Sequence, residues 1–224
     1  MEYFYKRVRF ALLISAILCS IPILFFWLQH ELNLISAQKL AIIPGNYNQW
    51  YGIFTIVLVH SGFEHLLFNM IPLFVLLFLV FMFYLNVSFQ VILFIIIAGG
   101  LGVFFTGDRL ELNQVYHVGA SGLVFGLITF LIAGGFLSMN RTLLVVSLVV
   151  VFFYGGTLWG VLPVNPKISW EGHFWGAIAG FLGAFLWRKS GPPKDIGVYK
   201  SNKSQEPDEY MIFSYVTKKQ MKGS

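Results

Sequence analysis

The chain has 224 residues, of which 57% are hydrophobic, 18% aromatic and only 11% charged, and its formal net charge is +5. A soluble domain carries roughly 25% charged residues, so this composition excludes an ordinary water-facing surface and predicts a multi-pass membrane protein in a lipid bilayer. The basic excess concentrates at the two ends of the chain, which indicates membrane topology, and we expect no nucleic-acid partner.

Repeated apolar runs predict an all-α membrane protein with six transmembrane helices. We expect residues 1–9 to form a cytoplasmic N-terminus, residues 10–189 the membrane domain, and residues 190–224 a flexible cytoplasmic tail. The single cysteine, Cys19, lies in the first run, so neither an intrachain disulfide nor a C-x-x-C zinc motif is available. The six predicted spans are residues 10–28, 64–85, 89–105, 121–137, 143–159 and 169–187.

The first span is a retained helix in this interpretation, because it is too long for a signal-peptide core and lacks a clear cleavage site. Basic residues flank the first span and the last one and also occur in one inner loop, so the positive-inside rule places both termini in the cytoplasm. These residues are Lys6, Arg7, Arg9, Arg141, Arg188, Lys189 and Lys194.

The segment between the first two spans, residues 29–63, is the longest predicted outer loop. Residues 51–59 within it are apolar but too few to cross a bilayer. We therefore expect a re-entrant or interfacial segment that packs against the outer ends of the helices.

Four polar residues are predicted to share one depth in the membrane. His65 and Asn69 lie in the first turns of the second span, Ser121 opens the fourth, and His173 lies about one turn into the sixth. All three spans start at the outer face, and at about 1.5 Å per residue these side chains fall within about 10 Å of it. Such a coincidence of uncommon residues indicates a site.

Ser121 and His173 are the candidate catalytic pair. A serine hydroxyl is a weak nucleophile unless a base accepts its proton, and histidine is the usual base near neutral pH. Small residues beside each member predict close approach of the fourth and sixth spans. The plainer interpretation is that these glycines only pack the helices together. It does not explain why each row of glycines begins beside a member of the candidate pair. The glycines are Gly122 and Gly126 on one span, and Gly176, Gly180 and Gly183 on the other.

His65 and Asn69 are candidates for stabilising an oxyanion. They are four residues apart, so they project from one helical face, and the helix N-terminus at Ser121 adds free backbone N–H groups. Neither Glu64 nor Glu171 has the obvious geometry of a third member of a catalytic triad. A buried extra charge would be costly at this depth, which favours a dyad.

Other intramembrane chemistries lack their residues. The chain contains no H-E-x-x-H motif, and of its aspartates Asp108 falls in a loop and Asp195 in the tail. A metal held by His60, His65 and His173 would lack a carboxylate ligand in register. We expect no metal and no cofactor.

The three motifs, taken in order, resemble the signatures of the rhomboid family of intramembrane serine proteases. These motifs are His65-x-x-x-Asn69, Gly119-x-Ser121-Gly122 and His173-x-x-Gly176-x-x-x-Gly180, and the resemblance covers residues 50–187. It implies that Ser121 is the nucleophile, that His173 is the general base, and that His65 and Asn69 line the oxyanion hole.

The resemblance further implies cleavage of transmembrane protein substrates near their outer ends, in a bacterial inner membrane. His60 matches another family histidine, for which we expect a structural role in holding the loop. The sequence does not specify an oligomeric state.

The chain departs from the family pattern at several positions. Trp50-Tyr51 replaces a Trp-Arg pair in the first outer loop, residues 76–85 contain no glutamate, and Phe125 replaces a tyrosine, keeping the ring without its hydroxyl. These departures suggest a divergent member.

Two alternative readings remain. One is a non-catalytic rhomboid-like protein that binds membrane helices, which retention of all four site residues argues against. The other is a generic helical bundle, for which Ser121→Ala would change stability slightly and nothing else.

Overall fold

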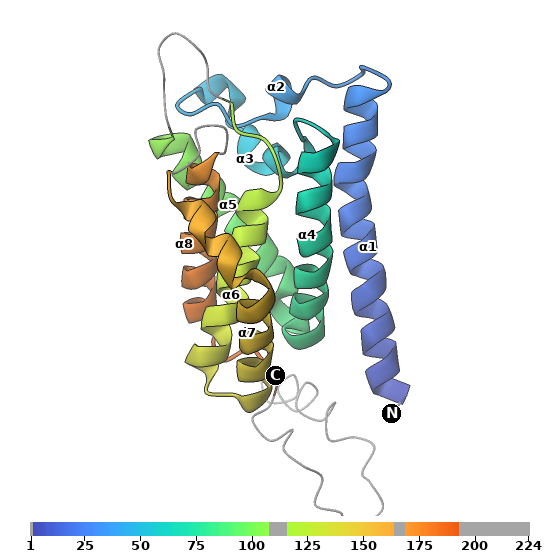
Figure 1. Ribbon diagram of the computed structural model, residues 1–224, viewed down its shortest axis with the longest axis vertical. Coiled ribbons are helices and arrows are strands. Elements are labelled where there is room, and N and C mark those ends of the chain that lie inside the picture. The colour runs from blue at the N-terminus through green and yellow to red at the C-terminus, as the bar shows by residue number, and fades with distance from the viewer. Residues whose placement is uncertain (1, 108–115, 164–168, 193–224) are drawn as a thin grey trace, which may run out of the picture. The chain divides into compact units, whose positions relative to one another are not determined.

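The structure, a computed structural model, describes residues 2–107, 116–163 and 169–192, and these form a helical bundle (Figure 1). Most of the predicted tail, residues 193–224, lies outside the described residues, so the description below concerns the unit that ends at Lys194. Among the described residues the long helices are α1 (Glu2–His30), α4 (Phe63–Phe83), α5 (Ser88–Thr106), α6 (Ser121–Ser138), α7 (Arg141–Tyr154) and α8 (Trp170–Leu186).

Within the described residues, five helical segments are long and apolar enough to cross a membrane. The sixth predicted span is α8, whose 17 residues lie at the short end of the range for a spanning helix. The prediction of an all-helical bundle is therefore confirmed. The five segments are Phe4–His30, Phe63–Phe83, Leu85–Thr106, Ser121–Ser138 and Arg141–Val161.

The first helix starts earlier than the predicted span. It begins at Glu2, whereas the apolar run begins at Phe10. Lysine and arginine are good helix formers, so the basic residues that mark the membrane boundary do not end the helix. An exposed ion pair between Lys6 Nζ and Glu2 Oε1, 2.7 Å apart, joins neighbouring turns.

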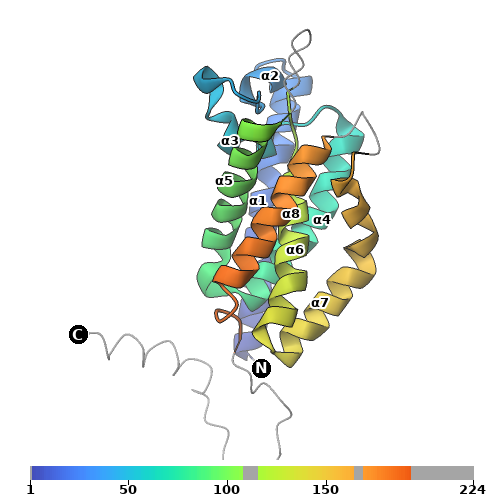
Figure 2. The same ribbon diagram turned by 90° about the vertical axis from the view of Figure 1, so that its left-hand side faces the viewer.

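The helices alternate in direction, so the N-terminal ends of α4, α6 and α8 lie at one end of this unit (Figures 1 and 2). Helix α6 packs against α8, α7, α5 and α4, whereas α1 packs chiefly against α4. Fully buried side chains of α4 and α6 form the centre of the core, among them Leu76, Val80, Phe81, Leu127, Ile128 and Phe130.

The first outer loop contains short helices and turns, none of them long enough to cross a membrane. These are α2 (Ala37–Leu40), α3 (Gly52–Thr55) and the 3-10 turns Tyr47–Gln49 and Ile56–Leu58. Helix α3 packs on α5, where Ile53 lies against Gly100 so closely that a Cβ at Gly100 would collide with it.

Backbone hydrogen bonds tie this loop to the segment that leads into α6. Ile42 and His117 exchange both N–H···O bonds, at 3.0 and 2.8 Å, and Gly119 N–H donates to the Ile56 carbonyl at 3.0 Å. The outer loop therefore fixes the backbone immediately before Ser121.

Candidate active site

Ser121 is the first residue of α6. Its amide belongs to the first turn of the helix, whose N–H groups have no intrahelical acceptor and favour negative charge nearby. The chain enters the helix through Gly119, which has φ +111°, a conformation that side-chain-bearing residues rarely adopt. A glycine at position 119 therefore suits the backbone turn that leads into Ser121.

Helices α6 and α8 come into backbone contact beside Ser121, which confirms the close approach predicted from the glycines. A Cβ added to Gly176 would overlap the carbonyl oxygen of Gly122, and one added to Gly180 would overlap that of Gly126. Thr129 Oγ1 also donates to the Ala177 carbonyl across the same interface, at 2.9 Å.

Gly183 differs from the other glycines of α8. The nearest atoms to a Cβ there would belong to the rings of Phe94, Phe130 and Trp187, at an ordinary van der Waals distance of 3.6 Å. The close contact therefore includes Gly176 and Gly180 but does not extend to Gly183.

The His173 ring stacks on the ring of Phe125, with centroids 4.1 Å apart and an interplanar angle of 5°. Phe125 lies four residues after Ser121, one turn further along the same face of α6. The stacking therefore places the imidazole against the face of α6 that also carries Ser121.

A backbone carbonyl orients this imidazole. His173 Nδ1 lies 3.0 Å from the carbonyl oxygen of Gly160, and a carbonyl only accepts hydrogen bonds, so Nδ1 carries the proton. In the neutral ring Nε2 is then the unprotonated nitrogen and can act as a base. No hydrogen bond joins the Ser121 and His173 side chains, both of which are described. Catalytic hydrogen bonds often tighten only when substrate is bound.

His65 and Asn69 reach the segment before Ser121 from one face of α4. The ring edge of His65 lies over Gly119, where an added Cβ would be 2.7 Å from Nε2, and its Nδ1 lies 3.0 Å from Ser61 Oγ. Asn69 is 4% exposed, its Nδ2 donates to the His65 carbonyl at 2.7 Å, and the same nitrogen is 3.8 Å from the Cβ position of Gly119. The His65 and Asn69 side chains therefore both approach Gly119, which lies two residues before Ser121.

His60 is fully buried and acts as an acceptor. Its Nε2 accepts the Ala120 N–H at 3.4 Å, and its carbonyl accepts from Gln29 Nε2 at 3.0 Å and from His30 Nε2 at 3.1 Å. Burial, with a smaller effect of the neighbouring His65, lowers the pKa of His60 to about 3. A neutral ring that holds Ala120 in place fits the structural role expected for this histidine.

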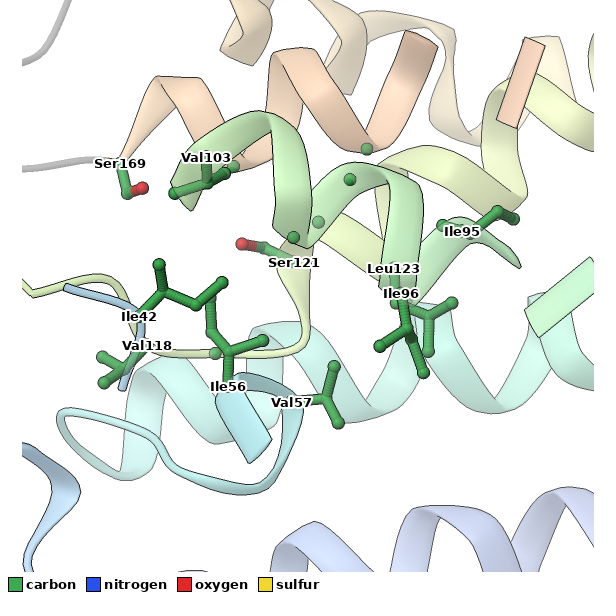
Figure 3. Close-up of a pocket in the computed structure, with 16 residues that line it drawn as sticks. Ile42, Ile56, Val57, Ile95, Ile96, Val103, Val118, Ser121, Leu123 and Ser169 are labelled. Atoms are coloured by element: carbon green, nitrogen blue, oxygen red, sulfur yellow. The ribbon is translucent and has the colours of Figure 1, made fainter. Parts of the chain in front are cut away.

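The Ser121 hydroxyl points into a pocket between α5, α6, α8 and the outer loop (Figure 3). The pocket encloses about 440 Å³ of space, its open mouth included. Aliphatic side chains and glycines form most of its wall, and Ser121 and Ser169 supply its side-chain hydroxyls. The labelled lining residues are Ile42, Ile56, Val57, Ile95, Ile96, Val103, Val118, Ser121, Leu123 and Ser169.

Two partners in the site were not predicted from sequence. The Gly160 carbonyl that orients His173 is a backbone group, which every residue type has, so no residue pattern marks it. Ser61 lies four residues before His65, but it precedes α4, so helical spacing does not relate the two positions.

Comparison with known proteins places residues 47–190 within the model of the Rhomboid domain family. An uncharacterized protein of Mycobacterium tuberculosis is 35% identical over 188 residues, which cover 81% of this chain and 78% of that protein. An uncharacterized protein of Mycobacterium leprae is 36% identical over 140 residues, or 61% and 55% of the two chains.

A Bacillus subtilis protein named "Putative rhomboid protease YdcA" is 29% identical over 202 residues, which cover 81% of this chain and 88% of that protein. The matched family region contains all three sequence motifs and the helices that carry them. The chain is a multi-pass integral membrane protein and belongs to the rhomboid family.

Proposed function

We propose that this protein is an intramembrane serine protease in which Ser121 and His173 form the catalytic dyad. The observation that carries the proposal is the placement of His173: its ring stacks on Phe125, one turn from Ser121, and its Nδ1 is committed to the Gly160 carbonyl. Nε2 is thereby left as the basic nitrogen.

In the proposed reaction His173 Nε2 accepts the proton of Ser121 Oγ as that oxygen attacks the peptide carbonyl carbon. The oxyanion of the tetrahedral intermediate accepts hydrogen bonds from His65, Asn69 and the first backbone amides of α6. His173 then gives its proton to the departing amine, which leaves an acyl group on Ser121. Water, deprotonated by His173, hydrolyses this ester and frees the serine.

The proposed substrates are transmembrane proteins, cleaved in or near their membrane-spanning segments. A transmembrane helix hides its peptide bonds in intrahelical hydrogen bonds, so a substrate must unwind locally before Ser121 can attack it. The site would open to the extracytoplasmic side of a bacterial inner membrane, with both termini of the protease in the cytoplasm.

The test is labelling of the purified protein in detergent with a fluorophosphonate, together with cleavage of a reconstituted single-span substrate in lipid vesicles. We expect the wild-type protein to be labelled at Ser121 and to cleave, and both activities to be lost in Ser121→Ala and in His173→Ala. Ser147→Ala is a control, because Ser147 is a buried serine of α7 whose hydroxyl bonds the Leu131 carbonyl at 2.8 Å.

Labelling that persists in Ser121→Ala would refute the assignment of the nucleophile. Folded wild-type protein that is neither labelled nor able to cleave would instead favour a rhomboid-like protein that binds membrane helices without cutting them.

A further inference from the structure

A second serine–histidine pair joins the two elements that carry the proposed dyad. Ser169 Oγ and His117 Nδ1 are 2.5 Å apart. His117 lies four residues before Ser121, and Ser169 lies four residues before His173. The pair therefore connects the approach to α6 with the start of α8, at equal sequence distance from each member of the dyad.

His117 is held firmly at its own position. It is 2% exposed, and its backbone exchanges two hydrogen bonds with Ile42 of the outer loop. Two residues later, Gly119 N–H is bonded to the Ile56 carbonyl. The imidazole thus projects from a backbone that is fixed independently of α8.

Ser169 occupies the N-cap position of α8, yet its hydroxyl makes no capping bond to the helix. Serine is among the favoured N-cap residues because its side chain can accept from the amides of the first turn. Here the hydroxyl lies instead within hydrogen-bond distance of a histidine on another element. The Ser169 hydroxyl therefore links the start of α8 to the segment before α6, and it does not cap the helix.

Ser169 and Ser121 also line the same pocket (Figure 3). The lining also includes Val118 and Gly119, which precede α6, and Gly172 and Gly176 of α8. The Ser169–His117 bond therefore joins the approach to α6 to the start of α8, in addition to the backbone contact between Gly122 and Gly176.

We infer that Ser169 and His117 are positioning residues that set the separation and orientation of Ser121 and His173. The inference rests on the proposed dyad. Reaction at a serine depends steeply on the placement of its base, because a shift of about 1 Å can cost a hundredfold in rate. Without the bond, the first turn of α8 shifts relative to Ser121, and His173 moves with it.

The experiment compares Ser169→Ala and Ser169→Thr with Thr129→Val. Ser169→Ala removes the hydroxyl without removing a helix cap, and Ser169→Thr restores a hydroxyl. Thr129→Val is the matched control, because it removes another hydrogen bond that links α6 to α8, to the Ala177 carbonyl. The measurements are the fluorophosphonate labelling rate, kcat and KM for a reconstituted substrate, and hydrogen exchange of the α8 first turn by mass spectrometry.

We expect Ser169→Ala to lower the labelling rate and kcat by about tenfold or more, with KM little changed. We also expect faster exchange at residues 170–174. Ser169→Thr should restore most of the labelling rate and most of the slow exchange at residues 170–174. Thr129→Val should be labelled at close to the wild-type rate. Unchanged labelling in Ser169→Ala, or an equal loss in Thr129→Val, overturns the inference.

A wild-type protein that neither labels nor cleaves refutes the proposed dyad, and hydrogen exchange then decides whether the Ser169–His117 bond holds α8. Faster exchange in Ser169→Ala, restored in Ser169→Thr, supports the holding role, and unchanged exchange overturns it.

Discussion

Each histidine beside Ser121 has one ring nitrogen paired with a specific partner. His173 Nδ1 pairs with the Gly160 carbonyl, His65 Nδ1 with Ser61 Oγ, and His60 Nε2 with the Ala120 amide. A hydrogen bond at one nitrogen helps determine which tautomer the ring adopts. The Gly160 carbonyl and the Ala120 amide thus favour the Nδ1-protonated tautomer of His173 and His60, whereas the Ser61 hydroxyl can donate to or accept from His65 Nδ1.

The stacking of His173 on Phe125 predicts that the phenyl ring is needed to hold the base. We expect Phe125→Leu to lower the fluorophosphonate labelling rate by about tenfold, since a tenfold change corresponds to about 1.4 kcal/mol and aromatic pairs contribute about 0.5–1.5 kcal/mol. The matched control is Phe130→Leu, which removes a buried ring of the same helix that pairs with Tyr84. Equal labelling by the two variants would contradict the prediction.

The low pKa of His60 predicts a pH dependence of stability. Its folded-state pKa is about 3, against an ordinary value of 6.5, so between these values the unfolded chain binds a proton that the folded protein excludes. The stabilisation is complete above pH 6.5 and is lost as the pH falls, by about 1.4 kcal/mol for each pH unit. Unfolding in detergent at pH 6.5, 5.5 and 4.5 measures this slope.

His60→Gln is the reference for that measurement, because glutamine does not titrate. We expect its free energy of unfolding to change less over the same pH range. Parallel curves for the wild type and the variant would show that His60 is not the group responsible.

At the scale of the helices, apolar runs and glycine spacing were sufficient to predict the bundle and the contact between α6 and α8. In lipid, small residues allow two helix backbones to come into contact. The spacing of the glycines therefore predicted this contact, which involves Gly122, Gly126, Gly176 and Gly180. The start of α1 at Glu2 was not predicted, because hydropathy marks the membrane boundary and not the helix end.

The contacts of Gly160 and Ser169 depend on tertiary structure and leave no local pattern. The catalytic roles of Ser121, His173, His65 and Asn69 stay predictions.

The glycine contacts predict different costs for two similar substitutions on α8. Gly176→Ala places a Cβ against the Gly122 carbonyl and should force α6 and α8 apart, which costs about 1–3 kcal/mol and lowers labelling of Ser121. Gly183→Ala meets only aromatic rings at 3.6 Å, and alanine favours a helix over glycine by up to about 1 kcal/mol. Thermal unfolding and labelling of both variants check this, and a Gly183→Ala protein as impaired as Gly176→Ala would refute it.

At the scale of the whole membrane unit, most of the described basic residues lie at one end and the candidate site near the other, with Lys39 of α2 as an exception (Figure 1). The α6–α7 connection and the start of α7, whose first residue is Arg141, lie at the same end as the start of α1, whereas α2 and α3 lie at the opposite end (Figure 1). By the positive-inside rule this distribution supports the proposed orientation, with the first of these ends in the cytoplasm and the candidate site on the outer side.

This orientation predicts which surface residues an impermeant reagent can reach. In a Cys19→Ala background, which removes the only cysteine, Tyr47→Cys should react with a membrane-impermeant maleimide in intact cells. Met139→Cys should react only after lysis. Both positions are highly exposed, at 71% and 80%, so burial does not explain a difference. The reverse pattern would invert the proposed topology.

The partner of His173 has a genetic consequence. Because the Gly160 group that receives the Nδ1 proton is part of the main chain, exchanging the side chain at this position does not delete the acceptor. An alanine at Gly160 would keep this acceptor but would place a Cβ 3.0 Å from the Phe125 ring and 3.3 Å from His173 Nδ1, so its effect would report crowding of the stacked rings and not loss of the hydrogen bond.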